Sequence, residues 1–375
     1  MEFIDLKAQY AVLKEKIDGQ INDVLESGAF IFGAQVRELE KDLADFAGVK
    51  HCITCANGTD ALSLALMVWD VKEGDAVFVP SFTFMATAEV VSLCGATPVF
   101  IDIEDGGFNI CSDGLETAIV KTLKEGKLIP KAVIPVDLFG LPADYTKITD
   151  IARKYNLHIL EDAAQGFGGS IDGKRACAFG DISTTSFFPA KPLGCYGDGG
   201  AIFTNDDGIA GLLRSLRVHG KGNDKYDNVR VGVNSRLDTI QAAILIPKLE
   251  EFEKIELESR DRAAKLYTRL LKDTVQTPRI PDGYFSSWAQ YAIMLPSQEI
   301  RDALAAHLKG KGIPTMVYYP RPLHLQTAYA SLGWREGSLP RCEAASRQIL
   351  CLPMHPYLEA AQIEQIANEI CLFLG

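Results

Sequence analysis

Short apolar runs alternate with amphipathic stretches between residues 51 and 204. The apolar runs fall at 51–55, 76–80, 98–103, 131–136, 157–162, 182–187 and 200–204. The amphipathic segments lie near 59–69, 84–94, 113–125 and 145–155. Strands that alternate with helices are typical of βαβ units, whose parallel sheet is covered by helices on both faces. The last two runs have no helix between them, which indicates an antiparallel pair. The sequence therefore predicts an α/β fold with a mostly parallel central sheet.

Helical patterns flank this region on both sides. Apolar residues recur with helical spacing in residues 1–50 and again from Arg236 onward, where Pro247 predicts a kink rather than an end. A small α+β unit follows a linker at 277–287; we expect strands at 288–295 and 313–319 and helices at 299–309, 340–350 and 359–374. The 375 residues thus predict two domains. Residues 1–250 hold the N-terminal helices and the sheet, and residues 251–375 hold a long linking helix and the small unit.

Charge and composition exclude several classes of protein. With Lys+Arg 38 against Asp+Glu 49 and a net charge of −11, the chain lacks the basic surface that nucleic-acid binding requires. No apolar run reaches the roughly 20 residues of a membrane span. The N-terminus lacks the pattern of a signal peptide, so we expect a cytoplasmic protein. The cysteines and histidines form no metal-binding pattern, and we expect no metal site.

The first candidate site lies in CANGTDALSLAL (55–66), where a strand, an Asn-Gly turn and a helix follow one another. We expect Thr59 and Asp60 to cap the helix. Gly58 would leave backbone N–H groups at the helix N-terminus free to bind an anion. An ordinary strand–turn–helix connection would show the same pattern.

The second candidate site lies in ILEDAAQGFGG (159–169), where an apolar strand ends in two carboxylates. Ligands of open α/β sheets bind at the carboxyl ends of the strands. Because side chains alternate along a strand, only one of Glu161 and Asp162 can face a ligand, where it would pair with a protonated ring nitrogen. The alternative is that Asp162 caps a helix.

The third candidate site surrounds Lys191, which lies between Pro189 and Pro192 in a stretch of apolar and small residues. Burial there would lower the pKa of the lysine, which suits a Schiff-base or general-base role. Ser186 lies five residues earlier and can give a hydroxyl to a phosphate. The alternative is a solvated surface lysine. An anion cradle, a carboxylate and a lysine are together what pyridoxal 5′-phosphate (PLP) requires.

These stretches also carry a resemblance to a known family. The residues concerned are NGTDAL (57–62), PSFTFMATA (80–88), EDAAQ (161–165), SFFPAKPLGCYGDGGA (186–201) and GVNSRLDTIQAAIL (232–245). Essentially end to end, the chain resembles the fold type I, PLP-dependent nucleotide-sugar aminotransferases of the DegT family. It is most similar to bacterial enzymes that aminate a UDP-linked 3-keto sugar, such as an N-acetylated hexuronic acid, for O-antigen or other surface glycans.

The resemblance implies a role for each matching residue. Lys191 would hold PLP as a Schiff base and transfer the proton, and Asp162 would pair with the pyridinium nitrogen. Further implied contacts are those of Gly58, Thr59 and Ser186 with the phosphate, Phe84 with the ring face, Gln165 with the phenolic oxygen, and Asn234 with the phosphate of a neighbouring subunit. The active unit would then be a homodimer with shared sites. Residues implied in the sugar-nucleotide pocket are Phe30, Arg236, Tyr318, Tyr319 and His324, although ordinary packing would explain these equally well. Ala190 stands where relatives often carry Ser.

The implied reaction moves an amino group from L-glutamate to a keto sugar nucleotide, a UDP-linked 3-keto hexose or hexuronic acid. Basic residues cluster in this acidic chain at Lys221, Lys225, Arg230 and Arg236, which favours an anionic ligand such as a nucleotide diphosphate. The alternative is that these residues are solvated surface charges. Three alternatives remain open. The first is amination of a 4-keto-6-deoxy sugar nucleotide. The second is a dehydratase of the same fold, although those relatives carry His at the position of Lys191. The third is a non-catalytic regulator.

Overall fold

The computed structural model describes residues 1–224 and 226–375, so Lys225 lies outside the described residues. Its central sheet has seven strands in the order β1-β9-β8-β5-β4-β2-β3. The strands are β1 (His51–Cys55), β2 (Asp75–Pro80), β3 (Thr97–Ile101), β4 (Ile129–Val133), β5 (His158–Asp162), β8 (Ile182–Ser186) and β9 (Gly200–Thr204). Strand β9 is antiparallel to both of its neighbours, and the other pairs are parallel. The predicted α/β fold and its antiparallel pair are confirmed.

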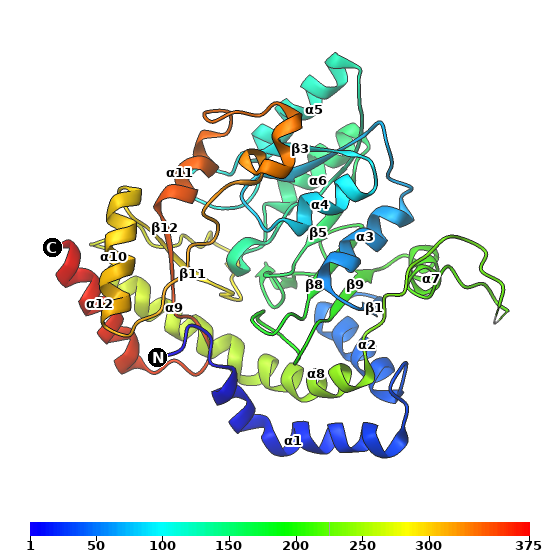
Figure 1. Ribbon diagram of the computed structural model, residues 1–375, viewed down its shortest axis with the longest axis horizontal. Helices are drawn as coiled ribbons and strands as arrows, with labels where there is room; N and C mark the ends of the chain where they lie inside the picture. The colour runs from blue at the N-terminus through cyan, green and yellow to red at the C-terminus, as the bar shows by residue number, and fades with distance from the viewer. Residues whose placement is uncertain (225) are drawn as a thin grey trace.

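Helices cover both faces of this sheet because the side chains on both faces are apolar (Figure 1). In β2, Val77 and Val79 enter a core on one face, whereas Ala76 and Phe78 enter a core on the other. The first core is covered by α3 (Gly58–Val68), α4 (Ala86–Leu93) and α7 (Asp207–Leu216). The opposite face is covered by α2 (Ala34–Ala47), α5 (Ser112–Glu125), α6 (Tyr145–Tyr155) and α8 (Thr239–Glu251). Helix α1 (Leu6–Ser27) packs on α8.

A long helical segment connects the sheet to the C-terminal part of the chain. Helix α8 continues through Pro247 into a π-helical turn (Phe252–Glu256) and then into α9 (Leu257–Leu271). Its first half contributes Leu245 and Leu249 to a core against the sheet, and its second half contributes Tyr267 and Leu271 to a separate C-terminal core. The predicted domain boundary at 250/251 therefore falls inside a continuous helical segment. The helix does not end at Pro247, as predicted, and the irregularity that the structure shows is the π-helical turn that begins at Phe252.

The C-terminal unit contains two short strands and three further helices. Strands β11 (Tyr291–Met294) and β12 (Ile349–Leu352) form an antiparallel pair. The helices are α10 (Gln298–Gly310), α11 (Pro340–Gln348) and α12 (Ala360–Leu374). A small sheet pairs β6 (Ser170–Ile171) and β7 (Lys174–Arg175), which lie between β5 and β8 in the chain, with β10 (Tyr284–Phe285), which precedes β11.

Two predictions for this unit were wrong. Residues 313–319 form no strand, and only the isolated bridge between Met316 and Cys351 is present. The flanking Pro314 and Pro320 lack the N–H groups that would extend a ladder. The predicted helix at 340–350 ends at Gln348, and the apolar residues that follow form β12, because a short apolar run fits either element. None of the helices in the described part of the chain has both the length and the apolar character needed to cross a membrane.

Candidate active site

A cavity of about 460 Å³ opens where the predicted site residues meet. Its walls come from the start of α3, the ends of β5 and β8, the turn that carries Lys191, and the segment between β2 and α4. The C-terminal unit contributes Gln290, Tyr318 and Tyr319. Carboxyl ends of neighbouring parallel strands meet at one edge of the sheet, which explains why residues far apart in the sequence share this cavity.

The N-terminus of α3 forms one end of the cavity. The side chain of Asn57, rather than Thr59 or Asp60, caps this helix: Asn57 Oδ1 accepts from the Asp60 N–H at 2.8 Å. The N–H groups of Gly58 and Thr59 have no acceptor within the helix, because first-turn donors never do. A Cβ at Gly58 would lie 2.7 Å from Ser186 Cβ, so only glycine lets β8 approach here. Two backbone donors and the Ser186 hydroxyl thus converge at a site suited to an anion.

Asp162 ends β5 with its carboxylate directed into the cavity. Its Oδ2 accepts from Thr87 Oγ1 at 2.9 Å, and its Oδ1 accepts from the Ala164 N–H at 3.2 Å. Burial raises the pKa of Asp162, whereas these two hydrogen bonds and the charge of Lys191 oppose that rise. The neighbouring Glu161 is fully buried and points to the other side of the sheet, as strand alternation predicts. The fixed carboxylate can therefore hold a cationic group of a ligand.

Lys191 lies in the turn after β8 and lines the same cavity. Its backbone N–H donates to Phe188 O at 2.9 Å, which closes the turn. Burial lowers the pKa of Lys191, and only the attraction of Asp162 opposes this effect. The structure shows no hydrogen bond or ion pair from Nζ to any other described residue. This lysine is thus free to act as a nucleophile or a base, contrary to the surface alternative.

Gln165 links the cavity wall to the C-terminal unit. Its Oε1 accepts from the Phe139 N–H at 2.8 Å, and its Nε2 donates to Tyr319 Oη at 2.9 Å. These bonds fix the orientation of the amide, which leaves one hydrogen on Nε2 for a ligand. Phe84 is 57% exposed and lies 6.3 Å from the Tyr319 ring, so its face is available to a planar group in the cavity.

Four predicted site residues do not line this cavity within the single chain. Asn234 is exposed, Arg236 is partly buried, and both precede α8. Phe30 is 48% exposed, and its backbone carbonyl accepts from the Thr239 N–H. His324 is buried at 1% exposure, which contradicts its predicted place in a ligand pocket. Its ring instead makes hydrogen bonds with Ser81 Oγ at 2.7 Å and Glu343 Oε1 at 3.1 Å.

Among the cavity residues that the sequence analysis did not predict, Asn57 and Thr87 hold parts of the site in place. Asn57 carried a readable signal, because asparagine is among the strongest N-cap residues and precedes the helix directly. Thr87 carried none, since its contact with Asp162 joins segments 75 residues apart.

A second, basic cavity of about 580 Å³ lies beside α7 and the segment that follows it. Arg214, Lys221 and Arg230 line it, and no carboxylate does so among the described residues. In an acidic chain, this concentration of positive charge gives the cavity a local electrostatic character that suits an anion.

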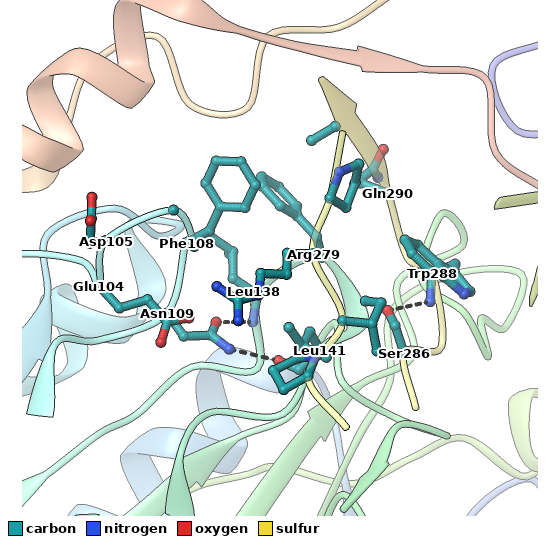
Figure 2. A pocket seen from close by; sticks show the side chains of 17 residues that line it. Glu104, Asp105, Phe108, Asn109, Leu138, Leu141, Arg279, Ser286, Trp288 and Gln290 are labelled. Atoms are coloured by element: carbon teal, nitrogen blue, oxygen red, sulfur yellow. Dashed lines mark hydrogen bonds between the residues drawn. The ribbon is translucent and has the colours of Figure 1, made fainter. Parts of the chain in front are cut away.

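A third cavity, of about 220 Å³, holds none of the predicted site residues (Figure 2). Two of its polar side chains, those of Asn109 and Ser286, hydrogen-bond to the surrounding backbone. Asn109 Nδ2 donates to Leu141 O, Asn109 Oδ1 accepts from the Leu138 N–H, and Ser286 Oγ accepts from the Trp288 N–H. The first cavity is therefore the candidate active site.

Comparison with known proteins identifies the family of the chain. The model of the DegT/DnrJ/EryC1/StrS aminotransferase family matches residues 11–371. The chain is 49% identical over 367 residues to a Pseudomonas aeruginosa protein named UDP-2-acetamido-2-deoxy-3-oxo-D-glucuronate aminotransferase, with 98% of each chain covered.

Solved structures show the same fold. A DegT/DnrJ/EryC1/StrS aminotransferase from Brucella abortus is 53% identical, with a TM-score of 0.97 and 100% of both chains covered. NtdA from Bacillus subtilis, solved with bound cofactor PMP, is 29% identical, with a TM-score of 0.88, 99% of this chain covered and 83% of the other. The family match, the relative and the fold all lead to one conclusion: this chain belongs to the DegT/DnrJ/EryC1/StrS aminotransferase family.

Proposed function

We propose that the chain is a PLP-dependent aminotransferase that moves an amino group from L-glutamate to a keto sugar nucleotide. The observation that carries the proposal is the convergence of Lys191, Asp162 and the N-terminus of α3 on one cavity. The residues present fit PLP. Gly58, Thr59 and Ser186 would hold its phosphate, Asp162 its ring nitrogen, Gln165 its phenolic oxygen and Phe84 its ring face. Lys191 would bind its aldehyde.

When bound, PLP supplies an electron sink for the carbon that bears the amino group. Asp162, held by Thr87 and the Ala164 N–H, would keep the ring nitrogen protonated. Lys191 Nζ would accept the proton from the donor carbon and return it at the next position as a general acid. The lowered pKa of Lys191 favours the neutral amine that this step requires. Glutamate would act first and the keto sugar second, as in ping-pong kinetics.

The substrate we propose is a UDP-linked 3-keto hexose or hexuronic acid. The similarity to an enzyme named for a 3-oxo glucuronate supports this choice. Arg214, Lys221 and Arg230 supply charges for a diphosphate, and Arg236 lies nearby in the sequence. Such a product would serve the cytoplasmic synthesis of O-antigen or another surface glycan. The presence of a desolvated lysine at position 191 argues against the two remaining alternatives, a sugar dehydratase of the same fold and a non-catalytic regulator. Neither of these functions requires such a lysine at this position.

We further propose that the active unit is a homodimer. The segment before α8 exposes apolar side chains, with Val229 at 53%, Val231 at 87% and Val233 at 37%. Exposed apolar side chains gathered on one segment mark a contact surface. Asn234 follows directly and is exposed, so a second copy could receive it at its phosphate site.

A panel of sugar nucleotides tests the proposed function. Purified protein loaded with pyridoxamine phosphate is mixed with each keto sugar nucleotide, and conversion of the bound cofactor to PLP is followed by its visible absorbance. The UDP-linked 3-keto hexuronate should react fastest, and a dTDP-linked 4-keto-6-deoxy sugar should react slowly. Faster reaction of the 4-keto sugar would transfer the proposal to the alternative substrate. If no sugar nucleotide reacts, the proposed function fails.

A further inference from the structure

Two carboxyl groups outside the proposed chemistry face each other beneath the active site. Asp137 follows β4, Glu161 belongs to β5, and both side chains are 0% exposed. The two carboxyl groups are within hydrogen-bonding contact. Neither of them forms an ion pair with a lysine or arginine in the part of the chain that the structure describes. Two ionised carboxylates in such contact would repel each other strongly, with no water to screen them.

The hydrogen bonds distinguish the two groups. Glu161 Oε1 accepts from the Cys177 N–H at 2.6 Å. Glu161 Oε2 accepts from the Phe179 N–H at 2.7 Å, the Gly180 N–H at 3.3 Å and Ser183 Oγ at 2.6 Å. Four donors therefore favour the ionised form of Glu161.

Asp137 has a different set of partners. Its Oδ1 accepts from the Ala143 N–H at 3.0 Å and from Tyr145 Oη at 2.8 Å. Its Oδ2 is buried and receives no hydrogen bond in the structure. An oxygen without a donor, beside a carboxylate, is explained if that oxygen carries a proton and is itself the donor.

The surrounding charges act in the same direction. Burial raises the pKa of Asp137 well above its usual range, and the negative charge of Glu161 adds to this effect. The other titratable groups that face the pair are Tyr145, Cys177, Asp162 and Tyr284. Each of these side chains is neutral when protonated and negative when deprotonated, so none of them can offset the negative charge of Glu161.

We propose that Asp137 and Glu161 share one proton, carried on Asp137 Oδ2 and donated to the Glu161 carboxylate, and that this pair positions Asp162 and Gln165. The second half of the proposal rests on the proposed function, because it assigns those two residues to the cofactor. Asp137 does not line the active-site cavity, so in this proposal it acts as a positioning residue.

Contacts of Asp137 lead directly to both residues. The Asp137 N–H donates to Asp162 O at 3.0 Å. A Cβ at Gly166 would lie 2.3 Å from Asp137 Cβ, so the backbone next to Gln165 rests against Asp137. Asp137 also precedes the 3₁₀ turn Leu138–Gly140, whose Phe139 N–H holds Gln165 Oε1 at 2.8 Å. On its other side, the turn is held by Asn109 (Figure 2).

Two isosteric variants test the shared proton. Asp137→Asn keeps an acceptor for Ala143 and Tyr145 and places an N–H donor toward Glu161, so it should fold with a melting temperature near that of the wild type at neutral pH. Both oxygens of Glu161 accept hydrogen bonds, and in Glu161→Gln an NH₂ group replaces one of these oxygens. This NH₂ group would face N–H or O–H donors instead of acceptors, so the variant should be much less stable than the wild type. The reverse order of stability would put the proton on Glu161 and overturn the assignment. Equal effects of the two variants would also overturn it.

The pH dependence of stability tests the same point without activity. The raised pKa means that the folded state keeps a proton that the unfolded state loses above about pH 4. The contribution of Asp137 to the free energy of unfolding of the wild type should therefore fall as pH rises above about pH 4. Asp137→Asn has no such proton to lose, so its melting temperature should increase relative to that of the wild type as pH rises. Infrared spectra should also show a protonated carboxyl band in the wild type that Asp137→Asn lacks. Parallel pH curves, or the absence of that band, would contradict the proposal.

Rates separate this inference from the proposed function. In the glutamate half-reaction, Asp137→Asn should keep most of the wild-type rate, and Asp137→Ala should lose about tenfold or more because a buried hydrogen bond is lost. If Asp137→Ala leaves the rate unchanged, the positioning role is wrong. If the wild type transfers no amino group, the proposed function fails, and the infrared and stability results still decide where the proton lies.

Discussion

Gln165 and Tyr319 join the two parts of the molecule by a hydrogen bond of 2.9 Å across 154 residues of sequence. Gln165 follows β5 of the central sheet, and Tyr319 belongs to the C-terminal unit. Because the other end of the amide is fixed by Phe139, this bond sets the position of Tyr319 in the cavity wall. The active site therefore depends on correct docking of the two parts.

Lys191→Ala should abolish amino transfer and leave the fold intact. The variant loses the group proposed to bind the cofactor aldehyde and to move the proton, and general acid–base catalysis alone contributes about 10²–10⁴-fold. Turnover and melting temperature would be measured together. Lys121→Ala, which changes an exposed lysine on α5, is the matched control. Transamination by Lys191→Ala near the wild-type rate would refute the assignment.

Asp162→Asn should lower the rate by about 100-fold or more, with a smaller loss of cofactor affinity, because the charge on the ring nitrogen is no longer supported. Thr87→Val keeps the charge and removes one hydrogen bond, so its loss should be smaller. Rates and cofactor dissociation constants would be measured for both variants. Loss of cofactor binding with an unchanged residual rate would indicate a structural role for Asp162.

Arg236→Lys should raise KM for the sugar nucleotide and change the glutamate half-reaction little. Arginine binds phosphate or carboxylate through two parallel hydrogen bonds, which lysine cannot reproduce. The two half-reactions would be measured separately, with the exposed Arg262→Lys as control. Equal losses in both half-reactions would assign Arg236 to a shared or structural role.

Val231→Asp should dissociate the proposed dimer and reduce activity together with it. Val231 is 87% exposed and would carry a charge into an apolar contact. Leu372→Asp, at a position 79% exposed on α12, is the matched control and should change neither property. Sedimentation velocity and activity would be compared at the same concentration. A fully active monomer would exclude shared active sites.

Lys248 should make stability depend on pH in the alkaline range. Burial lowers its pKa to about 8, and Nζ donates to Gly194 O. Between about pH 8 and pH 10.4 the unfolded chain binds more protons at this position than the folded chain, so the free energy of unfolding rises with pH, by roughly 3 kcal/mol at most. Lys248→Met should lack this rise. Denaturant unfolding across this pH range measures it, and identical slopes for both proteins would show that Lys248 does not titrate there.

The elements that hold the cofactor site were predictable because their signals are local. Strand ends, a capped helix and a proline-flanked lysine can each be read within about ten residues of sequence, and parallel strands place them at one edge. Gly58, Asp162 and Lys191 accordingly meet in one cavity.

The remaining site residues depend on contacts that no local pattern records. His324 is buried because Ser81 and Glu343, 243 and 19 residues away, satisfy its ring nitrogens. The segment at 313–319 has the composition of a strand, yet its tyrosines turn into the cavity. Asn234 and Arg236 lie outside the cavity of the single chain, so their roles depend on the proposed second copy.

The continuous helical segment from Thr239 to Leu271 has a consequence for dissecting the molecule. A protease requires an exposed and flexible peptide, and here the connection between the two cores is helical and buried against both of them. Limited digestion should therefore first cut exposed loops, such as residues 335–338, and leave the two halves attached. Expressing residues 1–250 alone would remove Phe252 and Leu257, which lie beyond that point in the chain and yet belong to the core against the sheet.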